Sequence, residues 1–285
     1  MTNEILVTGA SGFLGRHLVS ALESQGYSVR SHSSRDGDIA SCPLPMEGVR
    51  HVFHLAAKSF VPESWTNPQA FYSVNVMGTV NVLEHCRRHR ASVTLISSYV
   101  YGQPKRLPVA EDHPLAALNP YAHTKLLSED LGRFYEQHHG VRLVVVRPFN
   151  IYGPGQTPPF LVPLIIEQAL DPQTSTIRLK DLRPRRDYLY VDDAIRFLSK
   201  TVADDVKGTY NLGSGQSASV AEVAQLVIKA AGCDKGVVSD DQPRPQEVLD
   251  VRADISRAAN ELGWHPSISL QEGIARVVAA QRAKA

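Results

Sequence analysis

The 285-residue sequence predicts an α/β protein with a doubly wound parallel sheet and a smaller C-terminal region. Short apolar runs alternate with amphipathic helical patterns through the first half, which is typical of a parallel sheet covered by helices. A glycine-rich turn joins the first apolar run to the first helical pattern. The pattern changes after Gly153, where the chain becomes rich in proline at Pro154, Pro158, Pro159 and Pro163. We therefore expect one domain over residues 1–155 and a second region over residues 156–285, some segments of which return to the sheet.

The first predicted strand covers residues 5–7 and is followed by a turn that reads T-G-A-S-G-F-L-G over residues 8–15. The helical pattern after it continues through Leu18 and Leu22 and ends at Gly26. The glycine spacing of this turn lets backbone amides approach a pyrophosphate, which the positive end of the helix favours. The spacing differs from the standard G-x-G-x-x-G, so a tight turn without a ligand is the alternative.

Further strands are expected near residues 28–31, 51–55, 93–96 and 142–146. Ser97 and Ser98 follow the run at 93–96, at the carboxyl end of a strand, where ligands sit in open parallel sheets. A hydroxyl there can bond a substrate oxygen, although serines after a strand are also ordinary turn residues. In the second region, two S-x-x-E capping boxes at residues 219–222 and 269–272 predict helix starts.

Tyr121 and Lys125 form a Y-x-x-x-K pattern in a predicted helix. Residues four apart share one helix face, so the ammonium can lie beside the phenol. A phenol ordinarily titrates near 10, and a fixed neighbouring cation favours its ionised form. The pair therefore suits general acid–base chemistry in a hydride transfer, although the pattern by itself is common on helix surfaces.

The segment after the second predicted strand indicates which dinucleotide the chain binds. In dinucleotide-binding folds an acid at this place bonds the adenosine ribose, whereas small hydroxyls and an arginine accommodate a 2′-phosphate. Aligned on Gly26, the expected acid falls at Ser33, and Ser34 and Arg35 follow it. The sequence therefore favours NADP(H) over NAD(H). The alternative is a polar loop in which Asp36, or a slipped register, supplies the acid.

Composition narrows the class of protein. The net charge of +1 gives no reason to expect nucleic acid as a partner. The cysteines, Cys42, Cys86 and Cys233, lack a C-x-x-C pair, so neither a disulfide framework nor a zinc ribbon is expected. His85 and His89 are spaced as a possible metal pair, but cations near a helix end also complement its dipole, and we expect no metal. No apolar run reaches membrane-spanning length, and we expect a cytoplasmic protein.

Taken together, the motifs resemble the extended short-chain dehydrogenase/reductase family, which comprises nucleotide-sugar epimerases, dehydratases and reductases. The resemblance covers nearly the whole chain, and its order and spacing are specific. It rests on T-G-A-S-G-F-L-G at 8–15, H-L-A-A at 54–57, N-V-M-G-T at 75–79, S-S-Y-V-Y-G at 97–102, the Tyr121 and Lys125 pair, R-P-F-N-I-Y-G-P at 147–154, R-D-Y-L-Y-V-D-D at 186–193 and Y-N-L-G-S-G at 210–215.

The resemblance implies a Rossmann sheet in residues 1–155 that binds NAD(P), and mainly substrate binding in 156–285. It assigns Tyr121 as the acid or base, and Lys125 to the nicotinamide ribose, from where it lowers the Tyr121 pKa. Ser97, three residues before Val100, matches the catalytic Ser/Thr. The residues that it implies at the cofactor are Gly9, Ser11, Gly12, Phe13, Leu14, Gly15, Ser33, Ser34, Arg35, Asp38, Ile39, Leu55, Ala56, Ala57, Lys58, Asn75, Tyr121, Lys125 and Phe149. Those that it implies at a nucleotide-diphosphate sugar are Ser98, Tyr99, Asn150, Arg186 and Arg244.

The resemblance also implies which reactions of the family this chain does not catalyse. A dehydratase of this family carries Asp-Glu after the catalytic Ser/Thr, where this chain has Ser98 and Tyr99. A 3,5-epimerising reductase carries Cys at the Tyr99 position and His at the Gly155 position, and both are absent. NADP(H) favours net reduction, so we expect an NADPH-dependent 4-ketoreductase, with a 4-epimerase as the alternative. A non-catalytic NADP-binding regulator is a more distant alternative, because fold alone does not fix function.

The family also pairs two helices of each subunit into a four-helix bundle. Here the corresponding segments are residues 76–85 and 121–135, and both carry apolar side chains. The resemblance therefore implies a homodimer, unless all of these side chains face the sheet of their own subunit.

Overall fold

The structure is a computed structural model that describes residues 4–242 and 248–283. Its centre is a six-stranded parallel sheet with the strand order β2-β1-β3-β4-β5-β9. The strands are β1 (Glu4–Thr8), β2 (Ser28–His32), β3 (Val49–His54), β4 (Ser92–Ile96), β5 (Leu143–Pro148) and β9 (Gly208–Leu212). The predicted fold class is confirmed. The order reverses between β1 and β3, and a crevice at the carboxyl ends of such strands is the usual ligand site of this fold.

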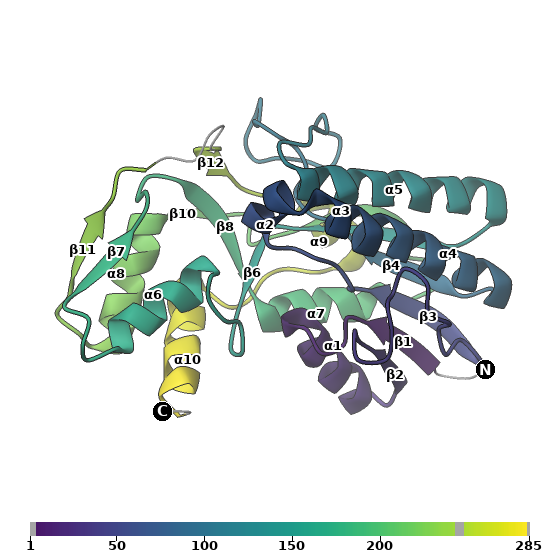
Figure 1. The fold of residues 1–285 in the computed structure, drawn as a ribbon, viewed down its shortest axis with the longest axis horizontal. Coiled ribbons are helices and arrows are strands. Elements are labelled where there is room, and N and C mark those ends of the chain that lie inside the picture. The colour runs from purple at the N-terminus through teal and green to yellow at the C-terminus, as the bar shows by residue number, and fades with distance from the viewer. Residues whose placement is uncertain (1–3, 243–247, 284–285) are drawn as a thin grey trace.

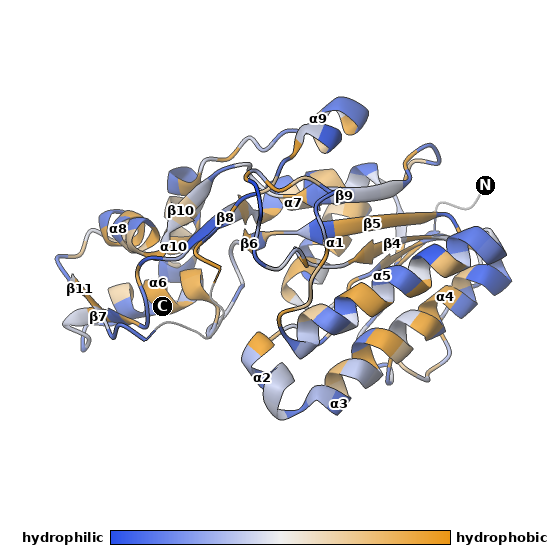
Figure 2. Cartoon of the chain, turned by 90° about the horizontal axis from the view of Figure 1, so that it is seen from above, coloured by the Kyte–Doolittle hydropathy of each residue, from blue (hydrophilic) through white to orange (hydrophobic). Residues whose placement is uncertain are grey.

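Helices cover both faces of this sheet (Figure 1). On one face, α1 (Phe13–Ser24) and α7 (Val191–Lys200) contact each other and pack on alternate side chains such as Ile5 and Val7. On the other face, α4 (Gly78–His89) and α5 (Pro120–His139) lie side by side, and α4 packs on Leu6 and Val52. Both faces of the strands are therefore buried, which explains why β4 and β5 are predominantly hydrophobic in Figure 2.

A helical connection over residues 55–77 links β3 to α4. It contains α2 (Val61–Thr66), α3 (Pro68–Phe71) and one turn of π-helix, η1 (Tyr72–Met77). All three contact other parts of this layer, and α2, α3 and η1 each contact α5. Single π-helical turns within longer helices occur frequently at functional sites.

The second region lies beyond the carboxyl ends of the large sheet and, in the described part of the chain, holds small sheets and the helices α6, α8 and α10 (Figure 1). Its strands are β6 (Asn150–Tyr152), β7 (Thr176–Leu179), β8 (Arg185–Tyr190), β10 (Ser217–Ser219), β11 (Gly236–Ser239) and β12 (Asp250–Val251). Its helices are α6 (Leu161–Leu170), α8 (Val220–Ala231) and α10 (Leu270–Arg282), whereas α9 (Ser256–Leu262) contacts β9 of the large sheet. Ser219 and Glu222 form the predicted reciprocal capping box, and Ser269 accepts the Glu272 amide at the start of α10.

Segments from beyond residue 155 contribute to the large sheet and its cover, because β9 pairs with β5 and α7 packs on α1. The assignment of the second region to substrate binding stays a prediction. Within the described ranges, no helix is long and apolar enough to cross a membrane.

Candidate functional site

The glycine-rich turn sits at the carboxyl end of β1 and packs against the segment that follows β3. Gly9 has a φ of +68°, and a Cβ on it would lie 2.7 Å from the Ala56 nitrogen. A Cβ on Gly15 would lie 2.3 Å from the Gly9 oxygen. Gly12 precedes α1, and no side chain caps this helix. The turn therefore brings bare backbone to the N-terminus of α1, which is the environment that a pyrophosphate needs.

Tyr121 and Lys125 lie in the first turns of α5, which begins after Asn119 accepts a hydrogen bond from the Ala122 amide at 2.8 Å. The Lys125 ammonium donates to the Ile96 carbonyl at 2.8 Å and lies 5.9 Å from the centre of the Tyr121 ring. The helix therefore presents both side chains at the carboxyl end of β4.

The pKa values of this pair are governed by burial. Burial lowers the pKa of Lys125 to about 8, although the Glu129 carboxylate acts in the opposite direction. Burial raises the pKa of Tyr121 to about 12, against a hydrogen bond from Ser98 that lowers it. The expectation that Lys125 lowers the Tyr121 pKa is therefore not met in this structure, because desolvation of the phenolate outweighs other effects.

The two serines after β4 have different surroundings. Ser97 is 2% exposed, and its hydroxyl donates to a Glu129 oxygen at 2.5 Å, in the interior of the protein. Ser98 is half-buried, and its hydroxyl bonds the Tyr121 phenol. Successive residues of an extended chain point to opposite sides. The structure therefore places Ser98, rather than Ser97, beside the phenol.

Asn75 lies in η1 and joins two parts of the site. Its amide nitrogen donates to the Lys58 carbonyl at 3.0 Å and to the Thr124 hydroxyl at 2.9 Å, and its oxygen accepts the Lys58 amide at 2.8 Å. Asn75 is 1% exposed. It therefore ties the segment after β3 to α5, one residue from Lys125.

Two other residues that were predicted to bind the cofactor contact protein side chains in this structure. Lys58 forms an ion pair with Glu63 at 2.8 Å. Phe149 is 4% exposed and stacks on Tyr99, with ring centres 5.1 Å apart. Tyr99 is half-buried and covers Phe149, so contact of Phe149 with a nicotinamide stays a prediction.

The end of β2 carries the predicted cofactor-specificity segment. The amide and the hydroxyl of Ser33 both donate to the Asp36 carboxylate at 2.8 Å. The Ser33 hydroxyl also accepts the Arg35 amide, and the Arg35 side chain is exposed. Asp38 is exposed, whereas Ile39 is buried. A cation and a carboxylate therefore stand together at the place where a ribose or its 2′-phosphate would be recognised.

The predicted substrate residues lie at the junction of the two regions. Asn150 in β6 donates to the carbonyl of Asp187 at 3.1 Å, and β6 pairs with β8. Arg186 is half-buried, and its guanidinium donates to the Arg185 and Val248 carbonyls. Arg244 lies outside the described residues.

A buried ion pair behind the site was not predicted from the sequence. Glu129 is fully buried, and Arg147 in β5 donates to both of its oxygens, at 2.9 and 2.7 Å. Arg133 and Ser97 add further donors to the same carboxylate. Glu129 comes one helical turn after Lys125, on the same helix face. The pattern Y-x-x-x-K-x-x-x-E over residues 121–129 is therefore the sequence feature from which this carboxylate could have been predicted.

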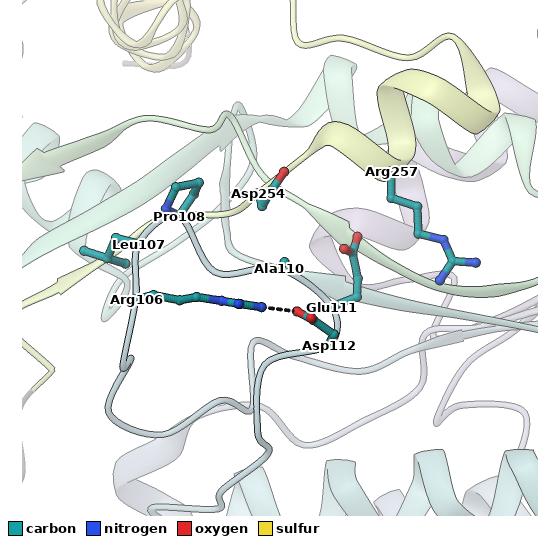
Figure 3. A pocket seen from close by; sticks show the side chains of 8 residues that line it. All are labelled: Arg106, Leu107, Pro108, Ala110, Glu111, Asp112, Asp254 and Arg257. Carbon is teal, nitrogen blue, oxygen red and sulfur yellow. Dashed lines mark hydrogen bonds and ion pairs between the residues drawn. The ribbon is translucent and has the colours of Figure 1, made fainter.

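A cavity of about 560 Å³ lies elsewhere, between the segment after β4 and the start of α9 (Figure 3). Its lining consists of Arg106, Leu107, Pro108, Ala110, Glu111, Asp112, Asp254 and Arg257. None of these was predicted as a site residue. Contacts around Tyr121, rather than this cavity, therefore define the candidate active site.

The sheet, the glycine turn and the tyrosine–lysine pair are together typical of the NAD(P)-dependent enzymes of the short-chain dehydrogenase/reductase class. A family model described as GDP-mannose 4,6 dehydratase matches residues 44–277. A putative UDP-glucose 4-epimerase of Methanocaldococcus jannaschii is 33% identical over 96% of this chain and 97% of its own length. A GDP-6-deoxy-D-mannose reductase of Pseudomonas aeruginosa is 29% identical over 98% of this chain and 97% of its own length.

A solved structure is also similar to this chain over its whole length. RMD from Pseudomonas aeruginosa, complexed with NADPH, superposes with a TM-score of 0.91 and 28% identity, covering 100% of both chains. The chain therefore belongs to the GDP-mannose 4,6-dehydratase family, within the extended short-chain dehydrogenases/reductases, and it is an enzyme.

We predict that Glu129→Gln lowers the free energy of unfolding by about 3–5 kcal/mol, because it leaves the Arg147 charge buried without its counter-ion. Urea unfolding at pH 7 measures this, with the exposed Glu136→Gln in the same helix as the control.

Burial raises the Glu129 pKa, but Arg147 and other donors outweigh it and hold the pKa below its ordinary 4.5. The carboxylate therefore stabilises the fold above pH 4.5 and loses this effect as the pH falls through its folded pKa. Equal stability of the parent and Glu129→Gln at pH 7 would contradict the prediction.

Proposed function

We propose that this enzyme reduces a 4-keto nucleotide sugar to its alcohol with NADPH. The observation that carries the proposal is the contact of the Tyr121 phenol with the Ser98 hydroxyl, beside Lys125 at the carboxyl end of β4. This arrangement can hold one oxygen and move one proton. The positions after Ser97 carry no carboxylate, so the acid pair with which a dehydratase of this family removes a hydroxyl is missing.

Each residue of the site has its own role in the proposed reduction. The nicotinamide group, when bound, supplies the hydride. Tyr121 donates its proton to the sugar oxygen, and Ser98 holds the same oxygen by a hydrogen bond. Lys125 provides positive charge beside the phenol, and Gly9, Gly12 and Gly15 expose the backbone that receives the pyrophosphate. Ser98 replaces Ser97 as the proposed catalytic hydroxyl, because Ser97 is committed to Glu129.

A 4-epimerase is the second candidate, and one observation favours it. The Asp36 carboxylate accepts hydrogen bonds from the Ser33 amide and hydroxyl, so an acid stands near the place where dinucleotide-binding folds recognise the ribose of NAD. The relative from Methanocaldococcus jannaschii carries the name of a putative epimerase. An epimerase would use the same residues at the reacting carbon and return the hydride to its other face.

Two reactions distinguish the candidates. In the first, a 4-keto sugar nucleotide and NADPH are mixed with the enzyme, and we expect stoichiometric loss of NADPH absorbance with formation of a stable alcohol. In the second, UDP-, GDP-, CDP- and dTDP-sugars are incubated without added cofactor, and we expect no change. Equilibration of C4 stereoisomers in the second reaction, with no net NADPH consumption in the first, would establish the epimerase instead.

We predict that Tyr121→Phe lowers kcat by about 10² to 10⁴-fold and leaves NADPH affinity unchanged, because the ring remains and the transferable proton is lost. Ser98→Ala should lower kcat more than Ser97→Ala, since the Ser98 hydroxyl contacts the phenol. Steady-state kinetics and fluorescence titration of NADPH measure both effects. A larger loss of kcat in a correctly folded Ser97→Ala would restore the assignment made from the sequence.

We predict that the enzyme prefers NADP(H) and that Arg35→Ala weakens NADPH binding by at least about 10-fold, the expected cost of a charged hydrogen bond. NADH, which lacks the 2′-phosphate, should bind Arg35→Ala nearly as it binds the parent. Asp36→Asn is the matched variant, because it removes the neighbouring carboxylate. Tighter binding of NADH than NADPH by the parent, together with loss of NADH affinity in Asp36→Asn, would show that Asp36 supplies the ribose-binding acid.

We predict a homodimer that pairs α4 and α5 of one subunit with those of the other. Val82 and Leu83 are buried within the subunit, whereas Met77 and Phe134 are 51% and 53% exposed on this layer. Phe134→Glu should therefore shift the protein toward the monomer in analytical ultracentrifugation. Val238→Glu, on the exposed side of β11, is the control. A parent protein that stays monomeric at all concentrations would refute the pairing.

A further inference from the structure

A second cavity, of about 680 Å³, lies at the opposite end of the sheet from Tyr121. It is placed where β3, β4 and β5 begin and where α4 and α5 end, as its lining residues show. They are Met46, Gly48, Val49, Arg50, Cys86, Arg87, His89, Arg90, Ala91, Ser92, His139, Gly140, Val141, Arg142 and Asp204. No residue assigned to the cofactor or to the sugar nucleotide is among them.

The lining of this cavity is rich in cations. It holds four arginines and two histidines, and Asp204 is the carboxylate among its described residues. Asp204 pairs with Arg142 at 3.3 Å, but its side chain is 90% exposed. The Arg142 guanidinium also donates to the Ser92 hydroxyl and to the carbonyls of Val202, Ala203 and Val206, so its donors are largely used within the protein. Arg87 is paired with Glu84. The charges of Arg50 and Arg90 remain uncompensated by any described carboxylate within ion-pair distance.

Arg50 is the residue that most needs a partner. Its Nε is buried and has no hydrogen-bond acceptor among the described residues. The guanidinium lies 5.6 Å from the centre of the Tyr27 ring. Burial lowers the pKa of Arg142, the Asp204 carboxylate acts in the opposite direction, and the nearby Arg50 charge lowers it again, so the two guanidinium groups repel each other. An anion beside the rest of the Arg50 guanidinium would offset its charge and reduce the repulsion between the two arginines.

The helix dipole explains only part of this cluster. Arg87 and His89 lie in the last turn of α4, where cations are stabilised by the helix end. Arg50 is the second residue of β3, and Arg142 directly precedes β5, so neither has that reason to be there. The cavity of Figure 3 provides a contrast, because its Arg106 bonds the lining residue Asp112 and its Arg257 bonds Glu261, which lies in α9 outside the lining.

We propose that the cavity lined by Arg50, Arg90 and Arg142 binds a small polyphosphate anion, separately from the catalytic cleft. The planar guanidinium group matches phosphate oxygens and can bind them through two hydrogen bonds. The volume lies within the range of small-molecule sites, which suits a nucleoside polyphosphate or a bare phosphate chain.

Isothermal titration calorimetry of the full chain tests the proposal, with inorganic tripolyphosphate and ATP as separate probes at constant ionic strength. Saturating NADPH and nucleoside diphosphate occupy the catalytic cleft beforehand. We expect the parent to bind tripolyphosphate with near 1:1 stoichiometry, and Arg50→Gln to bind it about 10-fold or more weakly. The control is Arg88→Gln, because Arg88 lies in the last turn of α4, near the cavity, with a side chain that is 63% exposed and does not line it. Its affinity should stay within about twofold of the parent.

Arg90→Gln is the second variant, because Arg90 is exposed and its replacement leaves the interior intact. Arg90→Gln should weaken tripolyphosphate binding several-fold. This result tests the proposal even if Arg50→Gln lowers the stability of the protein to heat. ATP binding more tightly than tripolyphosphate would assign a nucleoside to the ligand, and equal affinities would assign the phosphate chain alone. No binding by the parent, or equal affinity in the parent and both cavity variants, would overturn the proposal.

Discussion

The buried ion pair between Glu129 and Arg147 is the constraint on which the candidate site depends. It joins α5 to β5, and the Ser97 hydroxyl adds the end of β4 to the same carboxylate. Arg147 also donates to the Tyr101 hydroxyl, which in turn donates to Asn211 in β9. A buried charge without its partner is strongly unfavourable, so this network holds α5 in one position along the sheet. Lys125, one turn before Glu129, thereby meets the Ile96 carbonyl at the carboxyl end of β4.

A second, uncharged network fixes the other side of the site. The Thr8 hydroxyl bonds His54 Nδ1 at 2.9 Å, and His54 Nε2 bonds the Thr79 hydroxyl at 3.2 Å. Thr79 donates to the Asn75 carbonyl, and the Ala56 amide donates to Thr8. Burial lowers the pKa of His54 to about 3, so its ring is neutral and donates through one nitrogen while accepting through the other. The glycine turn, the end of β3 and η1 are therefore held together without a buried charge.

Burial also sets the chemistry of the central pair. The phenol and the ammonium are both pushed toward their neutral forms, which brings the Lys125 pKa close to physiological pH and takes the Tyr121 pKa away from it. A protonated phenol is the form that a reduction requires, because it must give a proton to the substrate oxygen. The orientation of Lys125 toward Ile96 keeps its charge at the site despite the desolvation cost.

The sequence by itself determined the parallel sheet, the glycine turn and the tyrosine–lysine pair, because each depends on local pattern: apolar runs, glycine spacing and helical periodicity. It also placed the capping box at Ser219. Only the tertiary structure decided which of Ser97 and Ser98 meets Tyr121, since a shift of one residue in an extended segment reverses the side chain, and motif alignment does not resolve it. The pairing of Glu129 with Arg147 and the unpaired Arg50 also required the fold. These contacts join residues far apart in the chain, and their energies depend on burial, which no local pattern encodes.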